Sequence, residues 1–279
     1  MKIRFTIISL VLLLGVLVVA CSPQTASTDV MDDQSEMADD EMMESEDDAM
    51  MDEEEEMSDD EMEEGEDDAM MDEEMATTTF VVRIENTSSE GGLTILAPGA
   101  YELNGHPLAF FMPGEADRDQ GLEALAEDGD PSGLVDTISE MMMGDEMMGF
   151  SINAFNTPVG ADAPGPIGPG GAYEFVVEAH TGQYLTFATM FVQSNDWFFS
   201  PNADGLALFD ADGNPLSGDI TNQIFLWNAG TEMDQTPGEG ADQAPRQASP
   251  DTGEAENGVV YMVEDFSDYQ VLVTISPQE

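Results

Sequence analysis

Basic residues are nearly missing from this sequence. Five lysines and arginines stand against 60 aspartates and glutamates, and the formal net charge is −55. Three of the five, Arg83, Arg118 and Arg246, lie beyond the first few residues. A surface this acidic repels nucleic acid and anionic lipid, and it attracts cations and basic partners. We therefore expect no nucleic-acid partner.

Histidine and cysteine are equally scarce, which limits the catalytic chemistry available to the chain. The two histidines, His106 and His180, stand beside turn-forming residues, and Cys21 is the one cysteine. A single thiol excludes an intramolecular disulfide and a cysteine zinc site. The sequence also lacks a Ser-His-Asp order, a histidine cluster and a phosphate-binding loop. These absences predict a protein that is not an enzyme.

The position of Cys21 indicates export. Lys2 and Arg4 are followed by an uncharged, largely apolar run, residues 7–20, and Cys21 comes directly after it. A basic start, an apolar core and small residues before a cleavage point are typical of an export signal. The pattern resembles the bacterial lipoprotein signal, so we predict removal of residues 1–20 and lipidation of Cys21. The protein would then be anchored to the cell membrane and face the periplasm or the cell exterior; the alternative is an ordinary secretory signal with an incidental cysteine.

The next segment, residues 21–76, is acidic and rich in methionine. Its residues 29–75 contain no basic or aromatic side chain, and residues 35–54 are duplicated without gaps in residues 55–74. Such a composition cannot bury enough apolar surface to offset its ordering entropy, so we predict a disordered linker. Methionine thioethers suit Cu(I), which leaves copper capture in the cell envelope as an alternative function of this segment.

Strand-like periodicity begins near Thr77 and continues to the end of the chain. Short alternating or apolar runs separated by Gly, Pro, Asn and Asp are typical of strands joined by turns. Two short helical patterns, residues 121–127 and 134–143, interrupt them. We therefore predict an all-β domain over residues 77–279, an antiparallel β-sandwich with small helical insertions. The expected strands are residues 77–86, 106–112, 150–155, 172–179, 184–192, 205–209, 223–227, 258–264 and 269–275.

Oxygen-bearing side chains follow two of the apolar runs. Asp196 comes after residues 184–192, and Asn228 and Glu232 come after residues 223–227. We expect both stretches to be loops at one end of the sandwich, where the three oxygens can converge on one hard cation such as Ca²⁺. The alternative is ordinary turn chemistry, in which Asp and Asn accept backbone hydrogen bonds.

Several stretches of this domain resemble the spondin N-terminal domain family in its bacterial lipoprotein form. The similarity covers residues 77–279 in order, and its most specific parts are Asn-Asp at 195–196 and Asn-Ala-Gly-Thr-Glu at 228–232; residues 121–131, 165–170 and 185–192 also match. The resemblance implies a sandwich like the C2 domain, a calcium site at Asp196, Asn228 and Glu232, and a role in extracellular binding or adhesion. Asn228 departs from the family's aspartate, and the lost charge should leave a weak affinity, with Kd about 10⁻⁴–10⁻³ M.

The sequence thus predicts a membrane-anchored binding or adhesion module that holds Ca²⁺. Its further partner is an extracellular ligand or protein that the sequence does not identify, and we expect a monomer.

Overall fold

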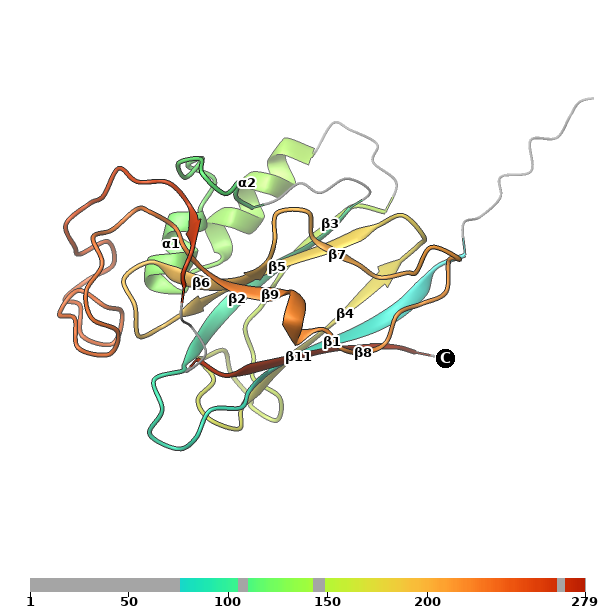
Figure 1. Cartoon of the computed structure of the whole chain (residues 1–279), viewed down its shortest axis with the longest axis horizontal. Coiled ribbons are helices and arrows are strands. Elements are labelled where there is room, and N and C mark those ends of the chain that lie inside the picture. The colour runs from blue at the N-terminus through green and yellow to red at the C-terminus, as the bar shows by residue number, and fades with distance from the viewer. Residues whose placement is uncertain (1–75, 105–109, 143–148, 265–268, 279) are drawn as a thin grey trace, which may run out of the picture. The chain divides into compact units, whose positions relative to one another are not determined.

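The computed structural model describes residues 76–104, 110–142, 149–264 and 269–278. These residues form two antiparallel β-sheets and two short α-helices, an all-β sandwich with a small helical insertion as the sequence predicts (Figure 1). Neither helix of the described residues is long and apolar enough to cross a membrane. The predicted signal, Cys21 and the methionine-rich linker to residue 75 lie outside the described residues.

The smaller sheet is built on alternating sequences. Phe80, Val82 and Ile84 of its second strand are buried, whereas the residues between them are half-buried. Side chains on a strand point to opposite faces in turn, so this alternation places one face on the core. The strand order is β4 (Ala172–Ala179), β1 (Thr78–Asn86), β11 (Val271–Pro277) and β8 (Gly218–Asp219).

The larger sheet is covered on both faces, and its central strand β5 reads as a continuous apolar run. Seven of the eight residues of β5 are buried, as expected where a strand is covered on both sides. The strand order is β10 (Tyr261–Met262), β9 (Ile224–Asn228), β6 (Trp197–Pro201), β5 (Tyr184–Phe191), β2 (Leu96–Asn104) and β3 (Ser151–Phe155), with β7 (Leu206–Ala207) also paired to β5. A 3₁₀ turn, η1 (Thr221–Gln223), precedes β9.

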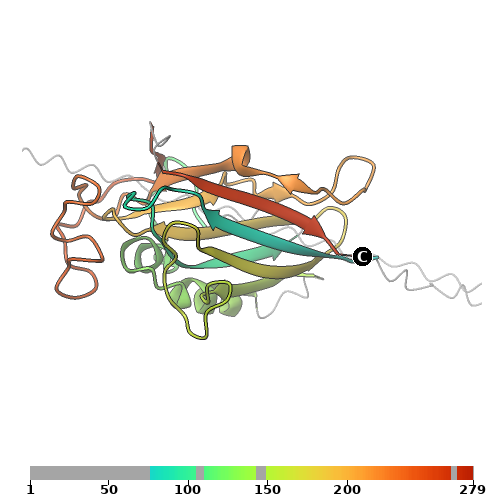
Figure 2. The ribbon, with the colours of Figure 1, turned by 90° about the horizontal axis from the view of Figure 1, so that it is seen from below.

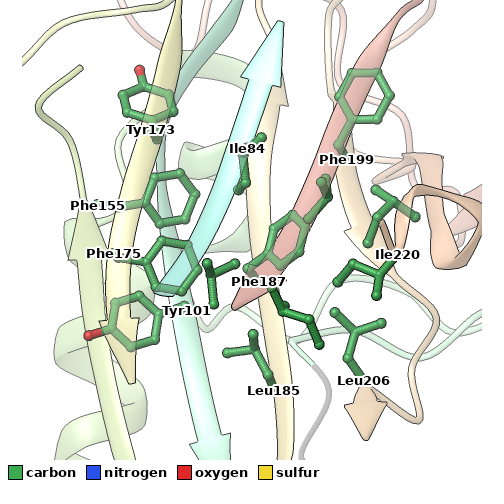
Figure 3. Close-up of a cluster of buried hydrophobic side chains, with 14 of the residues drawn as sticks. Ile84, Tyr101, Phe155, Tyr173, Phe175, Leu185, Phe187, Phe199, Leu206 and Ile220 are labelled. Atoms are coloured by element: carbon green, nitrogen blue, oxygen red, sulfur yellow. The ribbon is translucent and has the colours of Figure 1, made fainter. Parts of the chain in front are cut away.

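Aromatic side chains from both sheets fill the space between them (Figure 3). The rings of Tyr101 and Phe175 stack with centroids 4.3 Å apart, and the rings of Phe155 and Phe175 stack at 5.0 Å. Offset stacked pairs add to the free energy gained from burying the rings. Phe187 of the central strand is fully buried in this cluster.

A second apolar cluster lies between the larger sheet and the helices. Figures 1 and 2 show both helices, in green, beside the larger sheet, and in Figure 1 they lie on the side opposite β1 and β11. Helix α1 (Leu122–Asp128) and helix α2 (Ser132–Met142) bury their apolar side chains against Phe198 and Trp227. Gly129 ends α1 at φ 69°; its N–H donates to the carbonyl oxygen of Leu125, and the N–H of Asp130 donates to that of Ala124, each at 3.1 Å. The Asp-Gly-Asp sequence at this point is therefore a helix stop.

The sequence prediction was wrong at three places in the sheets. The proline and glycine in residues 96–104 indicated a break, yet this segment is β2, with a register shift between Leu96 and Gly99. A Cβ at Gly99 would overlap the carbonyl of Ala188 and the ring of Phe155, so the glycine permits the close strand contact. The strand expected at 106–112 is not formed by residues 110–112, and 105–109 lie outside the described residues.

The third error concerns the proposed loop at Trp197. Residues 197–201 form β6, an interior strand between β5 and β9, rather than a loop. Asp196 therefore stands directly before a buried strand, and Asn228 is the last residue of the neighbouring one.

Candidate functional site: an acidic end of the sandwich

Asp196 is the most deeply buried carboxylate at the end of the larger sheet. Its side chain has no exposed surface, and Oδ2 accepts backbone hydrogen bonds from Thr231 (2.9 Å) and Glu232 (3.3 Å). Oδ1 is also buried but has no hydrogen-bond partner among the described residues. Burial raises the pKa of Asp196 to about 7; the backbone N–H donors oppose this rise, and the charge of Asp234 adds to it. A buried acceptor without a donor is costly, so this oxygen indicates a missing partner.

Asn228 lies beside Asp196 at the same turn. Its Oδ1 accepts a hydrogen bond of 2.6 Å from the N–H of Gly230, and its Nδ2 donates to Oδ1 of Asp234 at 3.2 Å. Gly230 adopts φ 71°, and a Cβ there would lie 2.6 Å from the carbonyl oxygen of Val259, so a glycine is required. The turn that follows β9 thus directs backbone N–H groups at both predicted ligands.

Glu232 reaches the site through its backbone rather than its carboxylate. Its side chain is 4% exposed, and Oε2 accepts a hydrogen bond of 2.9 Å from Nδ2 of Asn195. Gly253 packs so closely that a Cβ would overlap Oε1. The structure therefore places all three predicted residues at one end of the sheet, and it brings Asp196 and Asn228 to the same turn.

Asp234 belongs to this site although the sequence did not predict it. Its carboxylate accepts hydrogen bonds from three donors: Nε1 of Trp197 at 2.7 Å, Nδ2 of Asn228 at 3.2 Å and the hydroxyl of Tyr261 at 3.1 Å. The three donors are in register on neighbouring strands, since Trp197 and Tyr261 both pair with Asn228. Only the register of β6, β9 and β10 reveals this contact, because an aspartate in so acidic a sequence carries no signal of its own.

A second group of carboxylates, two from α1 and one from the segment between β9 and β10, adjoins the first. Oxygens of Glu123, Glu127 and Asp251 lie within 4.8 Å of one another. Glu127 is 4% exposed. Burial raises its pKa to about 8; a hydrogen bond with Thr231 opposes the rise, and the charges of Glu123, Glu232 and Asp196 add to it. Sequence reasoning treated Glu127 only as a helix residue.

Basic side chains do not neutralise these groups in the part of the chain that the structure describes. The ion pairs there join Arg83 to Glu85 and Glu174, and Arg118 to Glu115. Arg246 lies in the loop that covers this end, but its guanidinium donates to the carbonyl of Gly240 and to the side chains of Gln193 and Gln243. Like charges that are buried together favour protonation or a bound cation.

The long segment between β9 and β10 covers this end of the sandwich. Figure 1 shows it in orange-red beside α1. Gln243, fully buried, donates to the carbonyl of Thr236 at 3.0 Å, and Nε2 of Gln247 donates to Asp128 at 2.7 Å. Next to it opens a pocket of about 250 Å³, whose lining includes Asp117, Glu123 and Thr231. The pocket thus places two acidic side chains beside Thr231, whose N–H donates to Asp196.

The fold and this end together define an all-β sandwich protein with a buried carboxylate, one oxygen of which has no hydrogen-bond partner among the described residues. No protein-family model matches the chain, and a comparison with the curated proteins found no match either. The resemblance to the spondin N-terminal domain therefore stays a prediction, carried by the sequence motifs alone.

Proposed function

We propose that the protein is an exported, lipid-anchored binding module whose β-sandwich holds a calcium ion at the Asp196 end. The observation that carries the proposal is the orphaned oxygen of Asp196, fully buried and without a hydrogen-bond donor among the described residues. Calcium accepts carboxylate, amide and backbone oxygens in an irregular cage, so it suits a site of this composition.

The surroundings support a cation rather than a protein partner for this oxygen. The charges of Asp196 and Glu232 help to raise the pKa of Glu127, and none of the three residues forms an ion pair within the described residues. A bound divalent cation would offset their mutual repulsion and would join α1 to the segment after β9. The carboxylate of Asp196 would bind the calcium directly, and the other two predicted residues, Asn228 and Glu232, lie at the turn that surrounds it.

The proposed role in the cell is recognition at the envelope surface. It rests on the export signal, on Cys21 as the lipid attachment point and on the resemblance to the spondin domain, in which related modules act in adhesion. His180 lies in a turn, where Nδ1 is 3.0 Å from the carbonyl oxygen of Thr181, so we assign it no catalytic role.

The test is the thermal midpoint of the full chain with calcium or with a chelator. For a Kd of about 1 mM, 10 mM calcium should stabilise the fold by about 1.4 kcal/mol. This corresponds to a rise of about 3–6 °C for a domain of this size. Asp196→Asn keeps the shape of the side chain and should abolish the rise.

Asp212→Asn is the matched control, because it removes one exposed carboxylate from a turn elsewhere in the chain. It should retain the full rise. An unchanged midpoint of the wild-type chain in calcium would overturn the proposal, and so would an equal rise in Asp196→Asn.

A further inference from the structure

We propose that Asp234 is a ligand of the same cation and supplies the negative charge that Asn228 lacks. This inference rests on the proposed calcium site, and it names a residue that neither the sequence motif nor the resemblance indicated. The contact between the Asn228 amide and the Asp234 carboxylate carries it.

The hydrogen bonds of Asn228 fix the orientation of its amide. Oδ1 must face the Gly230 N–H, and Nδ2 must face Asp234, because the reverse orientation would pair donor with donor and acceptor with acceptor. An aspartate at position 228 would lose the donor and would place a second negative charge beside Asp234. The pair therefore holds one carboxylate and one amide, with the carboxylate on Asp234.

Asp234 is positioned as a ligand should be. Donors from three neighbouring strands, Trp197, Asn228 and Tyr261, fix its two oxygens. A carboxylate has about four lone-pair sites, so three hydrogen bonds leave capacity for a cation. In metal sites, hydrogen bonds from neighbouring residues commonly fix the orientation of a ligand in this way. Asp234 is also exposed, so a cation can reach it from solvent.

The buried Oδ1 of Asp196, which has no hydrogen-bond partner among the described residues, distinguishes this site from an ordinary group of surface carboxylates. Asp196 and Asn228 meet at the turn 230–232, and Asn228 in turn contacts Asp234. The negative charge of Asp234 adds to the rise in the pKa of Asp196. The buried Oδ1 of Asp196 has no hydrogen-bond donor among the described residues. A cation that contacts this Oδ1 and an oxygen of Asp234 would satisfy both groups at once.

Terbium luminescence provides a local test in the full chain. Tb³⁺ occupies hard-oxygen calcium sites and emits when a nearby tryptophan is excited. Trp197 contacts Asp234 directly, whereas residues 29–75 have no aromatic side chain. The sensitised signal therefore excludes terbium held by the acidic linker, and its displacement by calcium measures the calcium affinity.

The informative variants are Asp234→Asn and the exchanged pair Asn228→Asp with Asp234→Asn. The single variant should weaken calcium binding about tenfold or more, because affinity at such sites follows the number of charged ligands. The exchanged pair should recover most of the affinity, since it returns one carboxylate and one amide to the same contact. Asp212→Asn again serves as the control and should bind as the wild type does.

The outcomes separate this inference from the proposed function. Suppose that the wild type binds calcium and Asp196→Asn does not. If Asp234→Asn then binds with wild-type affinity, Asp234 is not a ligand, and the proposed calcium site still stands. An exchanged pair as weak as Asp234→Asn also overturns the role of Asp234, because this residue would then act only by holding Trp197 and Tyr261. A wild-type chain without sensitised terbium emission overturns the calcium site and this inference together.

Discussion

The side-chain amide of Asn104 donates a hydrogen bond to Oε1 of Glu102 inside the larger sheet. Both residues belong to β2 and both are buried, Glu102 completely. The second oxygen of Glu102, Oε2, has no hydrogen-bond partner among the residues that the structure describes. Burial raises the pKa of Glu102 from 4.5 to about 7, and the hydrogen bond from Asn104 opposes the rise.

The raised pKa of Glu102 predicts a loss of stability as the pH rises. Between about pH 4.5 and pH 7 the folded protein holds a proton on Glu102 that the unfolded chain releases. The contribution of this group is therefore complete below pH 4.5 and is lost toward pH 7, by at most about 1.4 kcal/mol per pH unit. Glu102→Gln keeps the shape and removes the titration.

Urea unfolding of wild type and Glu102→Gln across this pH range measures the effect. The variant should gain stability relative to the wild type as the pH rises. Glu178→Gln, which changes an exposed side chain of β4, is the control and should show no such gain. A constant difference between wild type and Glu102→Gln from pH 5 to pH 7 would contradict the prediction.

Gly99→Ala should destabilise the larger sheet. The added Cβ would overlap the Ala188 carbonyl and the Phe155 ring, both of which belong to paired strands. Overpacking of this kind costs about 1–3 kcal/mol, measured as a lower denaturation midpoint. Gly165→Ala is the control, because no atom lies within 4 Å of its Cβ position; equal midpoints for the two variants would argue against the close strand contact.

Phe187→Ala should be among the most damaging single substitutions in the core. The ring is fully buried between the sheets, and its loss leaves a cavity that the surrounding rings only partly fill. The expected cost is about 3–5 kcal/mol, read from chemical unfolding. Val176→Ala on the outer face of β4, where the side chain is 51% exposed, should change the stability little; a loss below about 1 kcal/mol for Phe187→Ala would disagree with the packing.

Cys21→Ala should release the protein from the membrane. If Cys21 carries the lipid, a bacterial host that expresses the full chain should incorporate labelled palmitate into the wild type but not into the variant. Ser22→Ala is the neighbouring control and should remain in the membrane fraction. Labelled, membrane-bound Cys21→Ala protein would exclude this attachment point.

Sequence periodicity predicts the strands that have one buried face or two. β4 begins and ends where the alternation of residues 172–179 indicates, and the apolar run from residue 184 gives β5. Periodicity does not predict β2, because Pro98 and Gly99 indicate a break in the strand. In the structure the glycine is required, since Ala188 and Phe155 pack closely against it. Periodicity does not predict β6 either, because the Asn-Asp sequence before Trp197 is typical of a loop.

The candidate site is predictable only in part, for a related reason. Asp196 and Asn228 come after two apolar runs of the sequence, residues 184–192 and 223–227, so their positions at one end of the sheet can be anticipated. Asp234 and Glu127 cannot be, because their contacts depend on the register of three strands and on the packing of α1. Among 60 acidic residues, sequence alone gives no reason to select these two.

The pairing of Asn228 with Tyr261 makes the intervening segment tolerant of changes in length. Its two ends meet on adjacent strands, so the chain leaves the sheet and returns to the same place. Longer or shorter versions would change the closure entropy only slowly with length, and the strand register would be preserved. The part of this segment that lies beyond the site residues can therefore change in length while the sandwich stays the same.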